Sequence, residues 1–521
     1  MSSSEPVIAA LRRYWGYYSF RPLQERIVAS LLAGHDACVV MPTGGGKSLC
    51  YQLPAAMRPG ETVIVVSPLI ALMHDQVMQL KQMGISAGLL NSSLPGNEQF
   101  KVAHQAAAGE YRLLYLSPER LARPDTVAWL KRVPVSLFAI DEAHCISEWG
   151  HEFRPDYRQL SSLREHFPKL AIAAFTASAT RRVRHDIIDQ LRLREPHKYI
   201  ASFHRANLRY VVKECESGSQ SALLVKALRS YEGSNVIVYA PTVNQVEQTV
   251  RFLEEQGIPA IAYHGRMESD VRKRNQEAWM SDDVRVLVGT IAFGLGINKA
   301  CVRAVIHLAL PKSLEQYYQE AGRAGRDGQP SDCVLLWQKR DVGLLAYFID
   351  QIADPAEKQR GWQRYRDICG YAQSRVCRHR QICLHFGEAP KWTSCEACDV
   401  CASAPDWLSF TGTAPGRPAP KSASPPAAAR RRGLSAAPQP AVFEGSSELR
   451  EYLRMWRRDV AKKKGIPAFT VMHDTSLDDL CRVMPESIAA LRGVYGFGER
   501  KTETYGREIL AAIDHFRHRR G

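Results

Sequence analysis

The sequence has no apolar run long enough to cross a membrane, and its start lacks the pattern of a secretion signal. Its most apolar stretches, such as TVIVVSPLIALM at residues 62–73, fall far short of the roughly 20 residues that a membrane helix needs. The opening MSSSEPV shows no charged segment followed by an apolar one. We therefore predict a cytoplasmic protein without a membrane partner.

The sequence also shows no pattern of paired cysteines, and it has fewer acidic than basic residues. The 13 cysteines are an odd number, and several, such as Cys38, Cys301 and Cys333, lie inside apolar runs, which argues against a disulfide framework and for a reducing compartment. Asp and Glu number 54 against 69 Lys and Arg, so the net charge is +15. This excess favours a polyanionic partner such as nucleic acid, although ribosomal contact, a membrane surface or simple solubility also fit it.

Near-continuous apolar runs recur from Cys38 to about residue 340, and each is followed by a helical pattern. The first set comprises ACVV, TVIVV, RLLYL, SLFAI and AIAAF, and the second comprises NVIVYA, AIAYH, RVLVGT, AVIHLAL and CVLLWQ. Such strands alternating with helices are typical of parallel sheets that are covered on both faces. Two sets predict an α/β protein with two lobes that meet near residues 200–220.

Composition divides the 521 residues into five segments. Residues 1–204 and 205–340 would hold the two lobes, and residues 341–402 combine helical patterns with cysteines. Residues 403–440 are mainly Pro, Ala, Ser and Gly with Arg430, Arg431 and Arg432, a composition that predicts a disordered basic linker. Helical periodicity returns at about Val442 and predicts an all-α bundle over residues 441–521.

A glycine-rich turn follows the first predicted strand, in VVMPTGGGKSLCYQ at residues 39–52. Backbone N–H groups around Thr43, Gly44 and Gly46 can surround phosphate oxygens. Lys47 can reach the β- and γ-phosphates, and the hydroxyl of Ser48 can hold Mg²⁺. Methionine occupies the first glycine position of the usual pattern, so an ordinary strand-to-helix turn stays an alternative for this motif alone.

An acidic pair follows another apolar strand, in SLFAIDEAH at residues 136–144. Asp141 and Glu142 can hold the water shell of Mg²⁺ and activate the water that attacks a phosphate. An acidic pair at a strand end is often only a solvated turn. Its place in the same predicted sheet as Lys47 favours a nucleotide site.

The second lobe contains arginines framed by glycines, in YYQEAGRAGRDG at residues 317–328. Arg323 and Arg326, with Gln319 before them, can supply permanent charge to a γ-phosphate in the transition state. Exposed helical arginines are usually just solvated. Combined with the two motifs of the first lobe, they predict that ATP binds between the lobes and that hydrolysis is coupled to their closure.

Three cysteines stand at C-x₂-C-x₂-C spacing, namely Cys395, Cys398 and Cys401. Thiolates so spaced in a reducing compartment typically bind zinc, and a closed tetrahedral site needs a fourth ligand. The spacing alone does not choose among the candidates in VCRHRQICLHFGE at residues 376–388. These candidates are Cys377, His379, Cys383 and His385.

Together the motifs resemble those of the RecQ DNA helicases of helicase superfamily 2, from LRRYWGYYSFRPLQ to CEACDVC and again at the C-terminus. The resemblance implies two RecA-like lobes, a RecQ-type helical zinc-binding subdomain, a linker and an HRDC bundle. It also implies an ATP- and Mg²⁺-dependent helicase that moves 3′ to 5′ on single-stranded DNA and acts in repair and recombination. The implied catalytic residues are Lys47, Asp141, Glu142, Gln319, Arg323 and Arg326, and Ser48 with Asp141 would hold Mg²⁺.

The resemblance also assigns residues around the base and the DNA. WGYYSFRPLQ at residues 15–24 is similar to an adenine-recognition motif, in which Tyr17 and Arg21 flank the base and the amide of Gln24 reads its edge. SPLIALMHDQ, YLSPERL and GTIAFGLGINK are similar to motifs that grip a DNA backbone, and FTASAT is similar to a motif that couples the two sites. The implied backbone contacts are Ser67, Ser117 and Thr290.

An aromatic loop follows the acidic pair, in CISEWGHEFRPDY at residues 145–157. From the residues alone, these aromatic side chains could equally form a small satellite core or stack on DNA bases. Base stacking is worth about 1–3 kcal/mol per base. The resemblance implies that this loop senses DNA and triggers ATP hydrolysis. Its four residues of interest are Trp149, His151, Phe153 and Arg154.

For the zinc site, the resemblance selects Cys377 as fourth ligand and leaves Cys383 to pack as a small apolar residue. GIPAFTVMHDTSLDDL and VYGFGERKTETYG resemble an HRDC domain. A basic helix there is either a DNA-facing surface or a solvated face; its members are Arg454, Arg457, Arg458, Lys462, Lys463 and Lys464. The low-complexity segment after Cys401 stands where most of the family carries a winged helix, so we expect that module to be absent.

The expected substrate is single-stranded DNA and tailed or forked duplex DNA, with single-strand-binding protein and recombination factors as implied protein partners. A DNA-stimulated ATPase that remodels protein–DNA complexes with little strand separation is the alternative, because the wing is expected to be absent. A zinc-plus-HRDC scaffold with an idle motor and an RNA-unwinding enzyme are lesser alternatives. The intact lysine, acidic pair and arginines argue against the scaffold.

Overall fold

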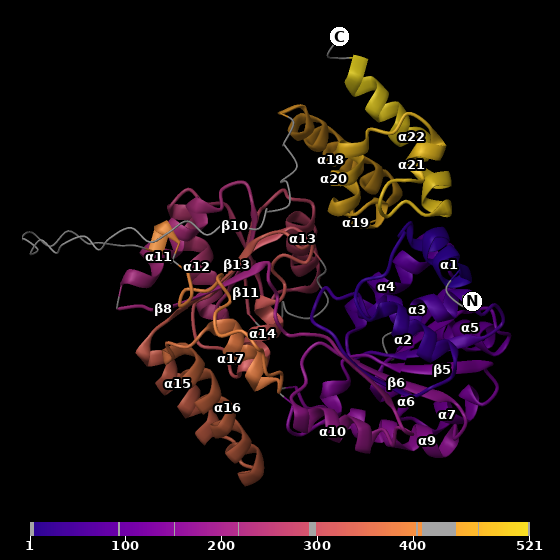
Figure 1. Cartoon of the computed structure of the whole chain (residues 1–521), viewed down its shortest axis with the longest axis horizontal. Coiled ribbons are helices and arrows are strands. Elements are labelled where there is room, and N and C mark those ends of the chain that lie inside the picture. The colour runs from indigo at the N-terminus through magenta and orange to yellow at the C-terminus, as the bar shows by residue number, and fades with distance from the viewer. Residues whose placement is uncertain are drawn as a thin grey trace, which may run out of the picture.

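The computed structural model describes residues 5–91, 94–150, 152–216, 218–290, 299–402, 405–408, 444–466 and 468–518. His151 of the aromatic loop and most of GTIAFGLGINK lie outside the described residues. The described part forms two α/β lobes, a helical region that carries the cysteines, and a C-terminal bundle above them (Figure 1).

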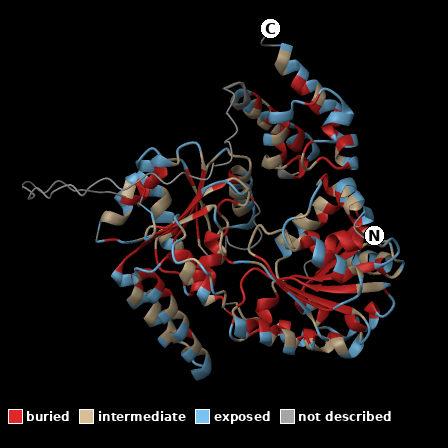
Figure 2. Cartoon of the chain, viewed as in Figure 1, coloured by how far each residue is buried: buried red, intermediate tan, exposed pale blue. Residues whose placement is uncertain are grey.

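The first lobe is built on a parallel sheet of seven strands in the order β3-β4-β2-β5-β6-β1-β7. Alternate residues of each central strand point to opposite faces, and both faces are buried, as the red strands of Figure 2 show. The strands are β1 (Ala37–Val40), β2 (Thr62–Val66), β3 (Ala87–Leu90), β4 (Leu113–Leu116), β5 (Val135–Ile140), β6 (Ala171–Thr176) and β7 (His197–Ile200).

Helices cover both faces of this sheet (Figure 1). The longer ones are α1 (Glu5–Trp15), α2 (Gln24–Leu32), α3 (Lys47–Met57), α4 (Ile70–Gln82), α5 (Gly96–Ala107) and α10 (Arg181–Gln190). The shorter ones are α6 (Pro118–Leu121), α7 (Pro124–Leu130), η1 (Ala143–Ile146), α8 (Pro155–Arg158), η2 (Gln159–Ser162) and α9 (Leu163–His166).

The second lobe has a parallel sheet of six strands in the order β10-β11-β9-β12-β13-β8. Its strands are β8 (Leu208–Glu214), β9 (Asn235–Tyr239), β10 (Ala260–Tyr263), β11 (Val286–Gly289), β12 (Val302–His307) and β13 (Ser331–Trp337). Its helices are α11 (Ser219–Ser230), α12 (Val243–Glu255), α13 (Ser269–Met280) and α14 (Leu314–Ala321).

The prediction of two lobes with parallel sheets is confirmed, and the ten predicted strands are present. Three further strands, β3, β7 and β8, are missing from the prediction, and each lies at an edge of its sheet. Strands β7 and β8 are partly exposed, so polar residues interrupt them and their apolar signal is weak, whereas β3 is fully buried but has only four residues, two of them the small Ala87 and Gly88. In β7, for example, only Tyr199 is buried.

The cysteine-bearing region contains α15 (Lys339–Asp350), α16 (Pro355–Gln373) and α17 (Arg378–His385). Residues 405–408 at the start of the predicted linker pack against the second lobe, where Trp407 and Leu408 join its apolar core. The η4 turn there spans Asp406–Leu408, so this short part of the linker differs from the expectation of disorder.

The all-α prediction for the C-terminus is confirmed. The C-terminal bundle comprises α18 (Glu444–Lys464), α19 (Ala468–Val471), α20 (Asp474–Val483), α21 (Ile488–Leu491) and α22 (Glu499–His518). It encloses an apolar core of its own, which includes Leu453, Leu480 and Ile509. Among the described helices, none combines the length and apolarity that a membrane span requires.

We predict that Asp36→Ala destabilises the first lobe. The carboxylate of Asp36 is fully buried, accepts hydrogen bonds from Ile172 N at 2.9 Å and Arg194 N at 2.6 Å, and pairs with Arg164. Removing the carboxylate leaves these donors without their acceptor, and breaking such a buried pair lowers the free energy of unfolding by about 3–5 kcal/mol. Thermal unfolding should show a lower Tm, whereas Asp125→Ala at an exposed ion pair should not. Equal Tm values for the two variants would contradict the assigned role.

Candidate active site and metal centre

The glycine-rich turn joins β1 to the N-terminus of α3. Gly44 and Gly46 both have φ of +81°, a left-handed conformation that glycine adopts without strain. The Lys47 ammonium donates to the carbonyl of Met41 at 3.2 Å. Burial lowers the pKa of Lys47, whereas the nearby charges of the acidic pair oppose that shift. The turn therefore combines backbone N–H groups, a helix N-terminus and a buried cation, which together suit a phosphate group.

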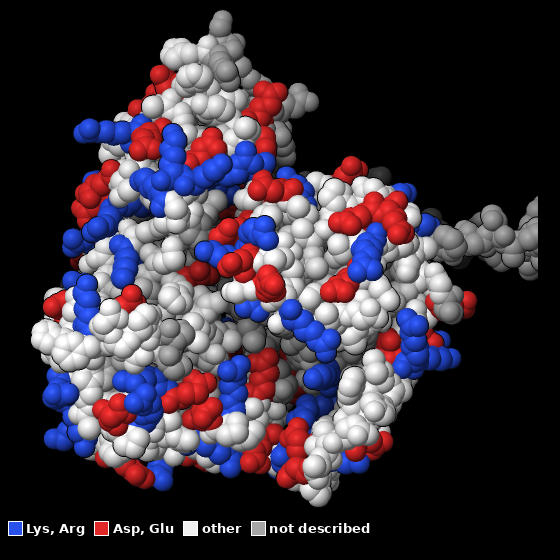
Figure 3. Space-filling model, turned by 180° about the vertical axis from the view of Figure 1, so that it is seen from behind, with Lys and Arg blue, Asp and Glu red and all other residues white. Residues whose placement is uncertain are grey.

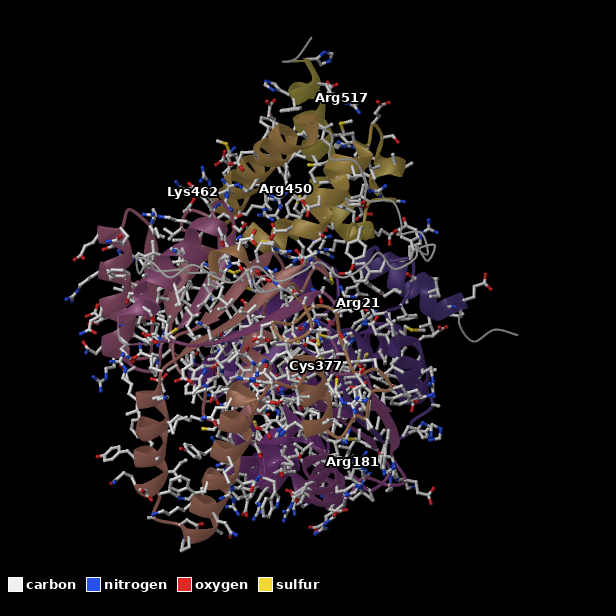
Figure 4. The ribbon with its side chains drawn as sticks, turned by 60° about the vertical axis from the view of Figure 1, so that its left-hand side comes forward. Arg21, Arg181, Cys377, Arg450, Lys462 and Arg517 are labelled. Atoms are coloured by element: carbon white, nitrogen blue, oxygen red, sulfur yellow. The ribbon has the colours of Figure 1, made fainter. Side chains whose placement is uncertain are left out.

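Two of the three predicted adenine residues, Arg21 and Gln24, contact this turn directly. The side chain of Gln24 accepts from Arg21 N at 2.8 Å and donates to Gly46 O at 3.1 Å. The Arg21 guanidinium donates to Gly44 O, and Figure 4 shows Arg21 where the first lobe meets the C-terminal bundle. The amide expected to read a base edge thus holds the turn in this structure.

The acidic pair lies at the end of β5, where Asp141 N donates to Val66 O at 2.8 Å. Burial, with the charge of Glu142 adding to it, raises the pKa of Asp141 to about 7, and Lys47 opposes this rise. For Glu142, burial acts in the same direction, but contacts with His144 outweigh it and lower the pKa. One buried and one half-buried carboxylate beside a single lysine would be better compensated by a dication, so the donor set fits Mg²⁺.

Hydrogen bonds connect the acidic pair to the second lobe. His144 Nδ1 lies 3.3 Å from Glu142 Oε2 and 3.0 Å from Thr176 Oγ1. Thr176 Oγ1 accepts from Ser178 N at 3.3 Å, and Ser178 Oγ accepts from Gln319 Nε2 at 2.8 Å. These residues of FTASAT therefore link Glu142 to α14. Gln319 thus contacts the first lobe through Ser178, which lies in the motif predicted to couple the two sites.

The arginine segment of the second lobe faces the glycine-rich turn. A Cβ atom added to Gly44 would lie 3.4 Å from Arg326 Cγ, so the two segments are in contact. Burial and the neighbouring Arg323 and Arg205 lower the pKa of Arg326 to about 9. Arg205 donates to Thr43 O at 3.1 Å and to Gly325 O at 2.9 Å, so it bridges the lobes. It belongs to no motif, and no signal in the sequence singled it out.

One cavity of about 350 Å³ collects the predicted nucleotide residues. Its lining includes Tyr17, Arg21, Gln24, Thr43, Gly44, Gly46, Lys47, Ser48, Asp141, Glu142, Gln319, Arg323 and Arg326. The lining also includes His473, Thr475 and Tyr495 of the C-terminal bundle, which the sequence did not place there.

Each of the three residues predicted to contact the DNA backbone comes directly after a β-strand. Ser67 follows β2 and Ser117 follows the neighbouring β4, so both lie at the carboxyl edge of the first sheet. Both are buried, and Ser117 Oγ accepts from Arg120 N at 3.3 Å as the cap of α6. Thr290 follows β11 of the second lobe. In this structure the two serine hydroxyls do not face solvent, and the contacts of all three with DNA stay predictions.

Trp149 of the aromatic loop is 39% exposed, and the guanidinium groups of two arginines approach its ring. The guanidinium carbon of Arg182 is 3.0 Å from the ring centroid, and that of Arg360 on α16 is 5.4 Å away. Glu148 pairs with Arg360 at 3.5 Å and with Arg158 at 2.8 Å. The ring is thus held by cations from the first lobe and the cysteine-bearing region, and an indole left this exposed does not form a satellite core.

The other described residues of this loop lie close by. Arg154 donates to Pro68 O at 3.4 Å, which connects the loop to the residue after Ser67. Arg158 lies over the ring of Phe153 at 5.4 Å. A Cβ atom at Gly150 would lie 2.7 Å from His144 O, so only glycine fits between the loop and the acidic motif.

Four cysteines converge in the cysteine-bearing region. The Sγ atoms of Cys377, Cys395, Cys398 and Cys401 all lie within 4.8 Å of one another. Zinc binds thiolates at about 2.3 Å in a tetrahedron, so the four sulfur atoms fit one zinc ion with a closed coordination sphere. Arg378 N also donates to Cys398 Sγ at 3.4 Å, a contact typical of thiolates around a structural metal.

The other three candidates for the fourth zinc ligand are His379, Cys383 and His385, and each has a different environment. His379 Nε2 lies 2.9 Å from Leu208 O, and His385 Nε2 lies 2.7 Å from Glu315 Oε1. Cys383 is fully buried in the apolar core around Phe386. The packing of α17 therefore determines which of the four candidates joins Cys395, Cys398 and Cys401.

The region around the cysteines is attached to both lobes. Asp399 lies between Cys398 and Cys401 and accepts from Val212 N of β8 at 2.9 Å. On the other side, Arg181 of the first lobe donates to Gly387 O at 2.8 Å. Cys377 and Arg181, labelled in Figure 4, come from these two parts.

The basic helix of the C-terminal bundle is not a free DNA-facing surface along its whole length. Arg457 is buried and donates to Asp474, and Arg454 and Arg458 contact the second lobe. The lysines Lys462, Lys463 and Lys464 are exposed. The expected basic surface is thus reduced to its C-terminal end.

The two parallel-sheet lobes, with a glycine-rich turn, an acidic pair and arginines around one cavity, define a two-lobed protein of the DEAD/DEAH-box class. Residues 21–187 match the family described as DEAD/DEAH box helicase, and residues 219–328 match the helicase conserved C-terminal domain. Residues 339–402 match the RecQ zinc-binding family and residues 446–513 the HRDC domain. The chain belongs to the RecQ family.

Curated relatives carry the same family name. An ATP-dependent DNA helicase RecQ of Bacillus subtilis is 33% identical over 585 residues, which cover 96% of this chain and 97% of that protein. Since this alignment is longer than the 521-residue chain, the Bacillus protein has residues without a counterpart here. A RecQ of Haemophilus influenzae is 42% identical over 76% of this chain and 64% of its own length. The chain thus spans under two thirds of that relative.

Solved structures support the fold. Dbp5 of S. cerevisiae bound to RNA and ADP BeF3 has a TM-score of 0.52 and 16% identity, covering 67% of this chain and 90% of its own. The DUF1998 helicase MrfA bound to DNA has a TM-score of 0.53 and 17% identity, covering 65% and 51%. At these identities the likeness concerns the fold alone.

We predict that Cys377→Ser lowers the zinc content of the full chain, because it removes one of four thiolates and opens the tetrahedron. Cys383→Ala is the matched control, since it truncates a buried thiol six positions away and should keep about one zinc per chain. Metal content is measured by atomic emission, with circular dichroism to check folding. Loss of zinc from the Cys383 variant alone would refute the assignment.

Proposed function

We propose that this protein is an ATP- and Mg²⁺-dependent DNA helicase that moves 3′ to 5′ on single-stranded DNA and separates tailed or forked duplexes. The single cavity that joins the glycine-rich turn, the acidic pair and the arginines of the other lobe carries the proposal. Its relatives in bacteria bear the name ATP-dependent DNA helicase RecQ, which supports the substrate.

The residues around the cavity suit phosphoryl transfer. Lys47 would neutralise charge on the β- and γ-phosphates, and Arg326, with Arg323 beside it, would do so from the second lobe. Glu142 would orient and deprotonate the attacking water. Ser48 and Asp141 would hold Mg²⁺, which neutralises phosphate charge when it is bound.

Coupling between ATP hydrolysis and DNA binding would use contacts that extend from the acidic pair to the second lobe and to the aromatic loop. His144, Thr176 and Ser178 connect Glu142 to Gln319 of the second lobe. The aromatic loop begins directly after the same motif, and Gly150 packs on His144. A base that stacks on Trp149 would displace Arg182 from the ring, and this change would reach the acidic pair through the loop.

We assign the protein to the cytoplasm and to DNA repair and recombination, with single-strand-binding protein and recombination factors as partners. The 13 unpaired cysteines support a reducing compartment. The longer Bacillus relative is compatible with the expected absence of a winged helix, which stays a prediction.

Lys47→Ala should lower DNA-stimulated ATP turnover by about 100-fold or more, because it removes a preorganised charge from the phosphates. ATP turnover and strand displacement are measured together on a 3′-tailed DNA duplex, beside a 5′-tailed duplex and an RNA duplex. Displacement of the 3′-tailed DNA only is expected for the unchanged chain. Turnover without displacement would instead support the remodelling ATPase, and absence of DNA-stimulated turnover would refute the motor.

Trp149→Ala should leave ATP binding unchanged and lose most of the DNA stimulation, since the ring that would stack on a base is removed. Phe100→Ala is the control, because Phe100 is 75% exposed on α5, outside the cavity lining. Turnover is measured against single-stranded DNA concentration. Full stimulation of the Trp149 variant would remove the sensor role from this loop.

A further inference from the structure

Arg205 lies on the connection between the two lobes, after β7 of the first and before β8 of the second. Its guanidinium donates to Thr43 O of the glycine-rich turn at 3.1 Å. It also donates to three carbonyls of the arginine segment, Gly325 O at 2.9 Å, Ala324 O at 3.3 Å and Gly322 O at 3.5 Å. One side chain therefore holds segments of both lobes that contribute to the nucleotide cavity.

A fifth hydrogen bond fixes the orientation of this guanidinium. Its Nε–H donates to Asn207 Oδ1 at 3.3 Å, and Asn207 Nδ2 donates to Gly325 O at 2.9 Å and to Gln329 O at 3.0 Å. A Cβ atom at Gly325 would lie 2.4 Å from Asn207 Nδ2, so any other residue there would crowd the contact. A guanidinium offers five N–H donors in a planar fork, and the five hydrogen bonds use all of its nitrogen atoms.

The hydrogen bonds to carbonyl groups also orient the N–H groups that follow them in the chain. In a trans peptide, the C=O of one residue and the N–H of the next point in opposite directions. Because Arg205 holds Thr43 O, the N–H of Gly44 points away from Arg205. The bond to Gly325 O orients the N–H of Arg326 in the same way. Gly44 and Arg326 line the cavity, whereas Arg205 is not among the described residues of that lining, so it supports the cavity wall from behind.

Positive charge alone does not account for this arrangement. Figure 3 shows Lys and Arg on both sides of the hollow between the lobes, with Asp and Glu among them. Burial, followed by the charges of Arg323 and Arg205, lowers the pKa of Arg326, so a third cation in this cluster is unfavourable by itself. The hydrogen bonds to the carbonyls offset this repulsion. The position therefore requires the fork of an arginine in addition to its charge.

We propose that Arg205 is a positioning residue for ATP hydrolysis. It keeps the arginine segment of the second lobe at one distance from the glycine-rich turn, so that Arg323 and Arg326 reach the γ-phosphate of a nucleotide bound at Lys47. Because these two arginines act on charge that develops in the transition state, Arg205 affects turnover more than nucleotide binding. This inference rests on the proposed function and adds a residue that belongs to none of its motifs.

Arg205→Lys keeps the charge but cannot reproduce the planar fork that reaches the four carbonyls. In DNA-stimulated ATP turnover by the full chain, kcat should fall about 10- to 100-fold, since a small misplacement of a group at the reacting phosphate costs up to that factor. KM for ATP should change less than about threefold, because ground-state binding is kept. Arg229→Lys is the matched control, since Arg229 is exposed on α11, and it should leave both constants unchanged.

Arg205→Ala allows a second measurement by chemical rescue. Guanidinium chloride, at a concentration too low to unfold the chain, should raise kcat of this variant by about threefold or more, because the ion can donate to the same carbonyls. Methylammonium chloride at the same concentration carries the charge without the fork and should not raise kcat. A residue that only stabilises the fold would give no difference between the two salts.

The outcomes separate this inference from the proposed function. If Arg205→Lys keeps the original kcat, or raises KM with kcat unchanged, the positioning role is refuted and the nucleotide site stands. If Arg205→Lys unfolds at a lower temperature, the rescue of Arg205→Ala decides: restoration by guanidinium alone supports the role, and an equal response to both salts refutes it. Absence of DNA-stimulated turnover in the unchanged chain would refute the proposed function and this inference with it.

Discussion

The close approach of the two lobes at the glycine-rich turn is the constraint on which the rest of the structure depends. Gly44 lies against Arg326, and Arg205 donates to carbonyls on both sides of the gap. Cations of one lobe thereby reach the anion site of the other. Residues of both lobes line the same cavity, so its shape depends on the separation of the lobes.

Two further parts of the chain span the same gap in different ways. The zinc-binding region contacts β8 through Asp399 and the first lobe through Gly387. Because a Cys₄ metal site is closed and rigid, this connection is a permanent part of the fold. The C-terminal bundle contacts the lobes through an aromatic stack, a glycine-lined surface and ionic pairs. Such contacts involve neither a metal ion nor a covalent bond, unlike the connection through the zinc-binding region.

Much of the fold and site could be predicted because their signals are local. Lys47, Asp141 and Arg326 each lie in a short motif next to a strand or helix, and the parallel sheets draw these motifs to one cavity. Arg205 and Tyr495 carry no comparable signal, since each acts through a partner more than 100 positions away. Ser178 lies in the FTASAT motif, but its partner Gln319 is 141 positions away. The edge strands β7 and β8 were missed because their partial exposure weakens the apolar pattern, and β3 was missed because its four residues include the small Ala87 and Gly88.

The sequence by itself determined the two parallel-sheet lobes, the phosphate turn, the acidic pair and the spacing of three zinc-binding thiols, because these depend on neighbouring residues. Only the tertiary structure decided which segments meet. It brought Cys377 to the other thiols, turned the amide of Gln24 onto the glycine-rich turn, and seated Tyr495 on Tyr17. Each of these contacts joins residues whose distance in the chain gives no sign of their distance in space, since packing of whole elements sets it.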